Sequence, residues 1–151
     1  MSRMRRVSVS IVTLRVEDPM LKGHCLCGAI QYETAAAPTL ECICHCTMCR
    51  RAAGSPMVGW FTVPRGTYRV LSGTPARYKS SPHAARTFCG TCGTPLTFET
   101  TRFPDETEVT ICSLADPEQV PPRDHTRAAT KLSWVKLADG LPVYLEQRTG
   151  G

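Results

Sequence analysis

The sequence lacks any apolar run of the roughly 20 residues that a membrane-spanning helix needs. The longest apolar stretch near the start, Val7–Leu14, is interrupted by two serines and a threonine. The N-terminus also lacks a recognisable secretory signal peptide, so nothing in the sequence implies an oxidising compartment. We therefore expect a cytoplasmic protein without a membrane segment.

Long helical periods and internal repeats are absent as well. Turn-forming residues are abundant, with 12 prolines and 11 glycines among 151 residues, and they divide the chain into short segments that alternate in the manner of strands. The predicted extended segments are 29–34, 40–44, 57–63, 67–71, 76–79, 85–88, 95–99, 108–113, 131–135 and 143–147. Short helical turns are predicted at 46–53, ended by Gly54, and at 116–118. The predicted fold class is mainly β.

The length suits a single domain, which we place at residues 21–147, with residues 148–151 as a tail. Residues 1–20 are expected to be an extension that is disordered or that results from an upstream start codon. Three arginines in the first six residues, with no acidic residue before Glu17, leave a weak mitochondrial presequence as the alternative.

Cysteine is the residue type with the clearest pattern. Nine cysteines occur, one of which, Cys112, stands alone. The others form three clusters: Cys25 and Cys27; Cys42, Cys44, Cys46 and Cys49; Cys89 and Cys92. Disulfides explain this poorly, because the count is odd and the ring closed by Cys-x-Cys is strained. Closely spaced thiolates do converge on a metal ion, and the absence of ferredoxin-type cysteine runs favours zinc over iron–sulfur clusters.

The spacing predicts two different sites. Cys89 and Cys92, followed by Gly93, form a knuckle that supplies two sulfurs to one point, and Cys25 with Cys27 is the natural second pair. Four thiolates make a closed, structural site, whose binding free energy, on the order of 10 kcal/mol, is folding free energy.

The middle cluster offers Cys44, Cys46 and Cys49 as three ligands, which is the arrangement of a catalytic zinc with an open position. Cys42 is the complication, because in an extended strand it projects to the same face as Cys44 and Cys46. As a fourth ligand it would close the site, and the sequence leaves both arrangements open.

Three segments carry a resemblance to a known family. They are Gly23-His24-Cys25-Leu26-Cys27-Gly28-Ala29, Cys44-His45-Cys46-Thr47-Met48-Cys49-Arg50-Arg51, and residues 86–96, Arg-Thr-Phe-Cys-Gly-Thr-Cys-Gly-Thr-Pro-Leu. Their order and spacing resemble the glutathione-dependent formaldehyde-activating enzyme family, also called the centromere protein V/GFA domain, over roughly residues 21–146. The resemblance implies a mainly β fold of the Mss4-like or β-tent kind, with short antiparallel strands organised around two zinc ions. It implies Cys25, Cys27, Cys89 and Cys92 as structural ligands and Cys44, Cys46 and Cys49 as the catalytic site.

The implied activity is a carbon–sulfur lyase that forms S-(hydroxymethyl)glutathione, with glutathione or another small thiol and an aldehyde as partners. Arg50 and Arg51 are candidate contacts for the carboxylates of the thiol. Trp60 and His125 are candidate residues of the pocket, and a solvated arginine pair, core packing of Trp60 and a structural His125 are the alternatives. Arg86 is expected to brace the Cys89 knuckle, His45 to point away from the sulfurs, and Cys112 to be buried.

A non-catalytic zinc module for a macromolecular partner is the main competing hypothesis, as the vertebrate centromere protein V branch suggests, and a thiol or metal sensor that uses Cys42 is a third. The formal net charge is +5, but seven thiolates and two zinc ions would lower it to about +2, so nucleic acid is not an expected partner. Exposed strand edges are compatible with a homodimer, and the sequence does not decide the oligomeric state.

Overall fold

The computed structural model describes residues 20–34 and 37–148. Residues 1–19, almost all of the predicted extension, and residues 149–151 of the predicted tail lie outside the described residues. Ten strands are present: β1 Leu21–His24, β2 Gln31–Thr34, β3 Thr39–Cys44, β4 Val58–Pro64, β5 Tyr68–Ser72, β6 Ala76–Ser81, β7 Ala84–Phe88, β8 Pro95–Thr100, β9 Phe103–Thr110 and β10 Asp124–Thr126. One α-helix, α1 (Thr47–Ala53), and short 3₁₀ turns at Arg65–Thr67, Ile111–Ser113, Pro117–Gln119 and Ala128–Thr130 complete the described elements. The mainly β class is confirmed.

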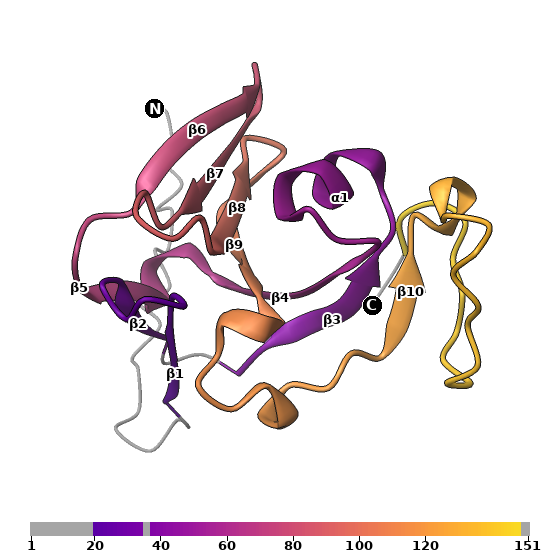
Figure 1. Cartoon of the computed structure of the whole chain (residues 1–151), viewed down its shortest axis with the longest axis horizontal. Helices are drawn as coiled ribbons and strands as arrows, with labels where there is room; N and C mark the ends of the chain where they lie inside the picture. The colour runs from indigo at the N-terminus through magenta and orange to yellow at the C-terminus, as the bar shows by residue number, and fades with distance from the viewer. Residues whose placement is uncertain (1–19, 35–36, 149–151) are drawn as a thin grey trace, which may run out of the picture.

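Two sheets form the body of the molecule. Seven strands pair in the order β10-β3-β4-β9-β8-β7-β6, and β1, β2 and β5 form a second sheet. All pairs are antiparallel except β10 with β3. Figure 1 shows the smaller sheet at one end of the molecule, β10 with the C-terminal segment at the other, and α1 beside β3 and β4. No helix in the described ranges has the length and apolarity that crossing a membrane requires.

Some predicted elements differ from the structure near the C-terminus. Residues 131–135 form a turn rather than a strand, because the Lys131 ammonium donates to the carbonyls of Leu132 and Val135 at 3.2 and 2.7 Å. Within 143–147 the pairing is limited to a single bridge between Val143 and His125. Strand β10 was not predicted, since three residues after two prolines show no alternation that could reveal it.

The alternation of side chains gives the seven-stranded sheet two different faces. Phe61, Val63 and Val109 point to one face, where they join Tyr32, Ile30 and Leu21 of the smaller sheet and its turn in the main hydrophobic core. Register pairs Trp60 with Cys42, and Glu108 with Thr62 and Phe98, so these residues share the other face. The second face is the one that carries the candidate site.

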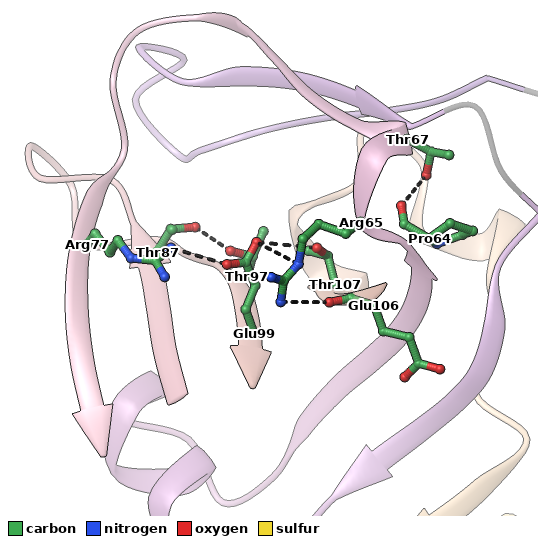
Figure 2. A network of polar contacts seen from close by, with 9 residues as sticks. All are labelled: Pro64, Arg65, Thr67, Arg77, Thr87, Thr97, Glu99, Glu106 and Thr107. Atoms are coloured by element: carbon green, nitrogen blue, oxygen red, sulfur yellow. Dashed lines mark hydrogen bonds and ion pairs between the residues drawn. The ribbon is translucent and has the colours of Figure 1, made fainter. Parts of the chain in front are cut away.

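A network of polar side chains connects several strands of the large sheet, as Figure 2 shows. Glu99 on β8 accepts from Thr107 at 3.3 Å and forms ion pairs with Arg77 at 3.2 Å and Arg65 at 4.0 Å. These pairs are partly exposed, so each contributes about 0.2–1 kcal/mol. The network ties β6, β8 and β9 to the 3₁₀ turn that follows β4.

The 3₁₀ turn Ile111–Ser113 corrects the prediction for Cys112, which is exposed rather than buried. Ile111 and Ser113 on either side are buried, because the turn replaces the expected continuation of the strand and directs the middle residue to solvent. Ser113 in turn accepts or donates a 2.6 Å hydrogen bond to the buried Tyr32 hydroxyl. This contact fixes β1 and β2 against the large sheet.

Candidate metal centres and active-site cleft

The first cysteine cluster joins two turns that are far apart in the chain. Cys25 and Cys27 lie in the turn between β1 and β2, and Cys89 and Cys92 in the turn between β7 and β8. Their four sulfur atoms all lie within 4.8 Å of one another. Two of the separations are 3.5 Å, from Cys25 to Cys27, and 3.8 Å, from Cys27 to Cys89.

Backbone geometry explains how each turn presents two sulfurs. Gly28 and Gly93 adopt φ angles of +75° and +79°, in the left-handed region that glycine enters without steric cost. The Ile30 amide donates to the Cys25 sulfur at 3.2 Å, and the Leu26 amide donates to Thr94 Oγ1 at 3.0 Å. The last bond links the two turns directly.

These distances fit a tetrahedral metal site. Four sulfurs at about 2.3 Å from a zinc ion lie about 3.8 Å from one another, whereas sulfurs in a disulfide lie about 2.05 Å apart. The pKa of Cys92 is lowered to about 5, first by the Thr94 hydroxyl and then by backbone N–H groups of Thr94 and Cys27. Thiolate-stabilising contacts of this kind suit a metal ligand.

The second cluster lies where β3 passes into α1. Cys44 ends β3, Cys46 is the N-cap of α1, and Cys49 lies in its first turn. The three sulfurs are within 4.8 Å of one another. The Cys49 amide donates to the Cys46 sulfur at 3.3 Å, and Gly54 at φ +61° ends the helix as predicted.

The three thiols of this cluster hydrogen-bond to one another, and these bonds shift their pKa values in opposite directions. The pKa of Cys46 is held far below that of an ordinary thiol, first by hydrogen bonding from Cys44 and then from Cys49. The pKa of Cys44 is raised correspondingly, since it donates toward Cys46. One sulfur of the group is therefore predisposed to be a thiolate, as a metal ligand must be.

Cys42 is not part of this group. Among the residues that the structure describes, only the sulfurs of Cys44, Cys46 and Cys49 form the second cluster. It shares the sheet face of Cys44 and pairs in register with Trp60. Burial raises the pKa of Cys42 to about 12, with the charge of Glu108 adding to the effect. The geometry thus presents three converging sulfurs, with Cys42 as a neutral thiol beside them.

A cleft of about 680 Å³ extends from the second cluster across the sheet face. Cys44, Cys46 and Cys49 are among the residues that line it, and Trp60 and Phe98 form an edge-to-face pair in its wall, with 6.5 Å between ring centroids. Its volume is that of a typical small-molecule site.

Arg86 connects the cleft wall to the sulfur cluster. Its guanidinium donates to the Cys49 sulfur at 3.6 Å and lies 4.7 Å from the Phe98 centroid and 5.9 Å from the Trp60 centroid. The prediction that Arg86 braces the Cys89 knuckle is wrong, because its strand position faces the cleft, on the register of Phe98.

Further charged side chains surround the cleft. Arg148 pairs with Asp124 at 2.8 Å, and Arg127 pairs with Glu146 at 3.6 Å. Arg102 and Glu108 also line the cleft, and in residues 20–34 and 37–148 neither has an ion-pair partner within 4.0 Å. Desolvation raises the pKa of Glu108 to about 7, opposed by the positive charge of Arg86.

The four residues predicted to bind substrate lie in different places. Trp60 lies in the cleft wall, with 3% of its surface exposed. Arg50 and Arg51 border a second, smaller hollow beside Trp134, and Arg50 donates to the Thr130 carbonyl at 3.2 Å. His125 pairs with Ile43 and so lies on the sheet face opposite Cys42 and Cys44.

His125 belongs instead to a buried chain of polar side chains. Its Nδ1 lies 2.9 Å from His45 Nε2, and its Nε2 lies 2.8 Å from an Asp139 carboxylate oxygen. An ionised Asp139 accepts the Nε2 proton of His125, which makes His125 Nδ1 the acceptor of the His45 proton. The chain fixes the segment between Cys44 and Cys46, and His45 points away from the sulfurs as expected.

Arg86, Arg102 and Glu108 were missed as site residues by sequence reasoning. A signal exists for Glu108, since a glutamate between Thr107 and Val109 in an alternating strand faces away from the apolar core. Arg102 lies in the tight turn between β8 and β9, where no local pattern indicates function.

Comparison with known proteins places the chain. A model of the family described as glutathione-dependent formaldehyde-activating enzyme matches residues 20–130. A protein of Schizosaccharomyces pombe named as an uncharacterized lyase is 36% identical over 81 residues, which are 53% of this chain and only 58% of that protein. A crystal structure of a Rhodobacter sphaeroides protein has the same fold, with a TM-score of 0.53 and 24% identity over 82% of this chain and 98% of that one. Because the family match covers well over half of the sequence and contains both cysteine clusters, the chain belongs to the glutathione-dependent formaldehyde-activating enzyme family.

Proposed function

We propose that this chain is a zinc-dependent carbon–sulfur lyase that forms and cleaves the adduct of a small thiol, such as glutathione, with an aldehyde such as formaldehyde. The observation that carries this proposal is the three-sulfur cluster of Cys44, Cys46 and Cys49 at the border of a cleft of about 680 Å³. Three protein ligands are typical of a catalytic zinc, whereas four are typical of a structural one.

The donor sets support two zinc ions, one for each cluster. Cys25, Cys27, Cys89 and Cys92 would hold a structural ion, and Cys44, Cys46 and Cys49 would hold the second. A zinc ion with one open position supplies Lewis acidity and lowers the pKa of a thiol or carbonyl-derived oxygen near it.

The cleft suits an anionic thiol. Glutathione carries two carboxylates, and an arginine guanidinium binds a carboxylate through two parallel hydrogen bonds. Arg86 and Arg102 line the cleft without an acidic partner within 4.0 Å in the part of the chain that the structure describes. They replace Arg50 and Arg51 in the proposal, and Trp60 with Phe98 would cover the aliphatic part of the ligand.

The reaction needs little beyond positioning and one proton. The sulfur of the thiol adds to the carbonyl carbon, the C–S bond forms as the C=O π bond breaks, and the oxygen takes up the proton that the thiol released. The reverse step returns the same thiol and aldehyde. Arg86, bonded to the Cys49 sulfur, would orient the cluster toward the cleft, and the apolar wall would exclude water.

Exchange NMR with ¹³C-formaldehyde and glutathione tests the proposal. Zinc-loaded protein is expected to accelerate exchange between free aldehyde and S-hydroxymethyl adduct above the background rate. Arg102→Ala should raise KM, whereas Arg51→Ala, outside the cleft, should leave kinetics unchanged. Background exchange rates at every protein concentration, with both zinc sites filled, would refute the proposal.

A further inference from the structure

We propose that Glu108 is the proton carrier of the cleft, taking the proton from the thiol and giving it to the aldehyde oxygen. This inference rests on the proposed function and names a residue role within it.

The position of Glu108 is the first argument. It lies on β9 near the middle of the seven-stranded sheet, and its register with Thr62 and Phe98 places it on the cleft face. The residues that line the cleft include Glu108 together with Cys44, Cys46 and Cys49. A ligand whose sulfur meets this cluster therefore occupies the same cavity as the Glu108 carboxyl.

The lack of a structural role is the second argument. Asp124 and Glu146, the other acidic residues of the cleft lining, form ion pairs with Arg148 and Arg127. Glu108 is half-buried, yet in the described ranges no hydrogen bond or ion pair within 4.0 Å engages its carboxyl. A desolvated carboxyl without a partner costs stability, and contact with a ligand or a part in the reaction would offset that cost.

The electrostatic surroundings suit a group that exchanges a proton near neutrality. Burial raises the pKa of Glu108, and the groups that act on its charge are Arg86, Glu106, Cys46 and Arg127. The charge of Glu108 also helps to raise the pKa of Cys42 on β3, which is therefore a neutral thiol. General acid–base catalysis is most effective when the pKa of the group lies near the working pH.

Binding of a substrate ammonium group is a weaker explanation. The nearby Arg86 guanidinium is the strongest charge acting on Glu108, and it would repel an ammonium group at the same place. A carboxyl that is partly protonated at neutral pH also binds a cation poorly.

The proposed step balances without an external reagent. The Glu108 carboxylate accepts the proton of the thiol, and the resulting thiolate adds to the carbonyl carbon. As the C–S bond forms and the C=O π bond breaks, the carboxyl returns the proton to the oxygen. The product is the hydroxymethyl thioether, and the carboxylate is regenerated.

The test compares the zinc-loaded wild type with Glu108→Gln and Asp105→Asn by exchange NMR from pH 5.5 to 9, with metal content measured for each. Asp105 is the matched control, because it lies three residues away on β9, is exposed, lies outside the cleft lining and is not among the groups that act on the charge of Glu108. We expect the wild type to show an inflection near pH 7. We expect Glu108→Gln to abolish it and to lower kcat roughly 10²- to 10⁴-fold, with KM within about threefold. Asp105→Asn should behave as the wild type.

Two results would overturn the inference. One is a Glu108→Gln variant that keeps kcat within threefold or keeps the wild-type pH profile. The other is a Glu108 carboxyl that titrates in ¹³C NMR at the ordinary pKa of a glutamate. A wild type that does not accelerate exchange refutes the proposed function instead, and the titration then still decides whether Glu108 has the required protonation behaviour.

Discussion

Replacing Gly23 by alanine tests the packing that holds the strand before Cys25. The Cα of Gly23 faces the buried Tyr32 ring, and a Cβ there would overlap the ring Cζ and hydroxyl of Tyr32. It would also lie 2.6 Å from the Ser113 carbonyl oxygen, closer than real Cβ atoms approach. Since the φ of Gly23 is not positive, backbone strain plays no part in this effect.

The cost has two components. Overpacking of a closed core costs about 1–3 kcal/mol. Displacing Tyr32 breaks its 2.6 Å hydrogen bond to Ser113 and leaves buried polar groups unpaired, at about 1–3 kcal/mol. The sum, about 2–6 kcal/mol, is a large part of the stability of a domain. At about 3 °C per kcal/mol for a domain of this size, it corresponds to a fall in Tm of roughly 6–18 °C.

Urea and thermal unfolding of the zinc-loaded protein would measure this loss. Gly66→Ala is the matched control, because its Cβ would meet no atom within 4 Å and its expected effect is within about 1 kcal/mol. If Gly23→Ala melted within a few degrees of Gly66→Ala, the close approach of β1 to Tyr32 would be wrong, and with it the placement of Cys25.

Three further predictions address the sites. Glu108→Gln should change how stability depends on pH. The pKa of Glu108 is raised from 4.5 to about 7 in the folded state, so the wild type loses up to about 3 kcal/mol of stability as pH rises from 4.5 to 7, and the variant should not. If the wild type and the variant showed the same change in urea midpoint between pH 5 and pH 8, this prediction would be refuted. Cys89→Ser should remove most of the folding free energy that a structural zinc contributes, on the order of 10 kcal/mol, whereas Cys49→Ser should stay folded. If circular dichroism melts found Cys49→Ser less stable than Cys89→Ser, the assignment of the two clusters would be overturned. His125→Ala should cost about 2–4 kcal/mol, because His45 and Asp139 lose their shared partner, and an unchanged urea midpoint would show that the buried chain is not formed.

The cysteine clusters could be predicted because local spacing determines how sulfurs converge. Cys89 and Cys92 are presented by a turn of a few residues with Gly93 at a positive φ, and such geometry follows from the sequence alone. The meeting of Cys25 and Cys27 with Cys89 and Cys92 depends on long-range strand pairing. It was predicted from the need for four ligands and from the family resemblance, not from local spacing.

The residues around the cleft were harder to predict, because register decides which face each one shares. The sequence predicted His125 as a loop residue of the pocket, but the pairing of β10 with β3 directs it away from the sulfurs. Arg86 is adjacent in sequence to one cluster and contacts the other, which follows only from the order of strands in the sheet. Arg50 follows Cys49 directly, yet helix rotation of about 100° per residue turns it away from the cleft.

Metal analysis combined with zinc-edge X-ray absorption would show whether the two cysteine clusters hold zinc and whether one ion has room for a thiol ligand. We expect two zinc ions per chain, one with four protein sulfurs and one with three, and a gain in average sulfur coordination when glutathione is added. A chain that binds a single ion or none after gentle purification, or a spectrum that glutathione leaves unchanged with both sites filled, would contradict it.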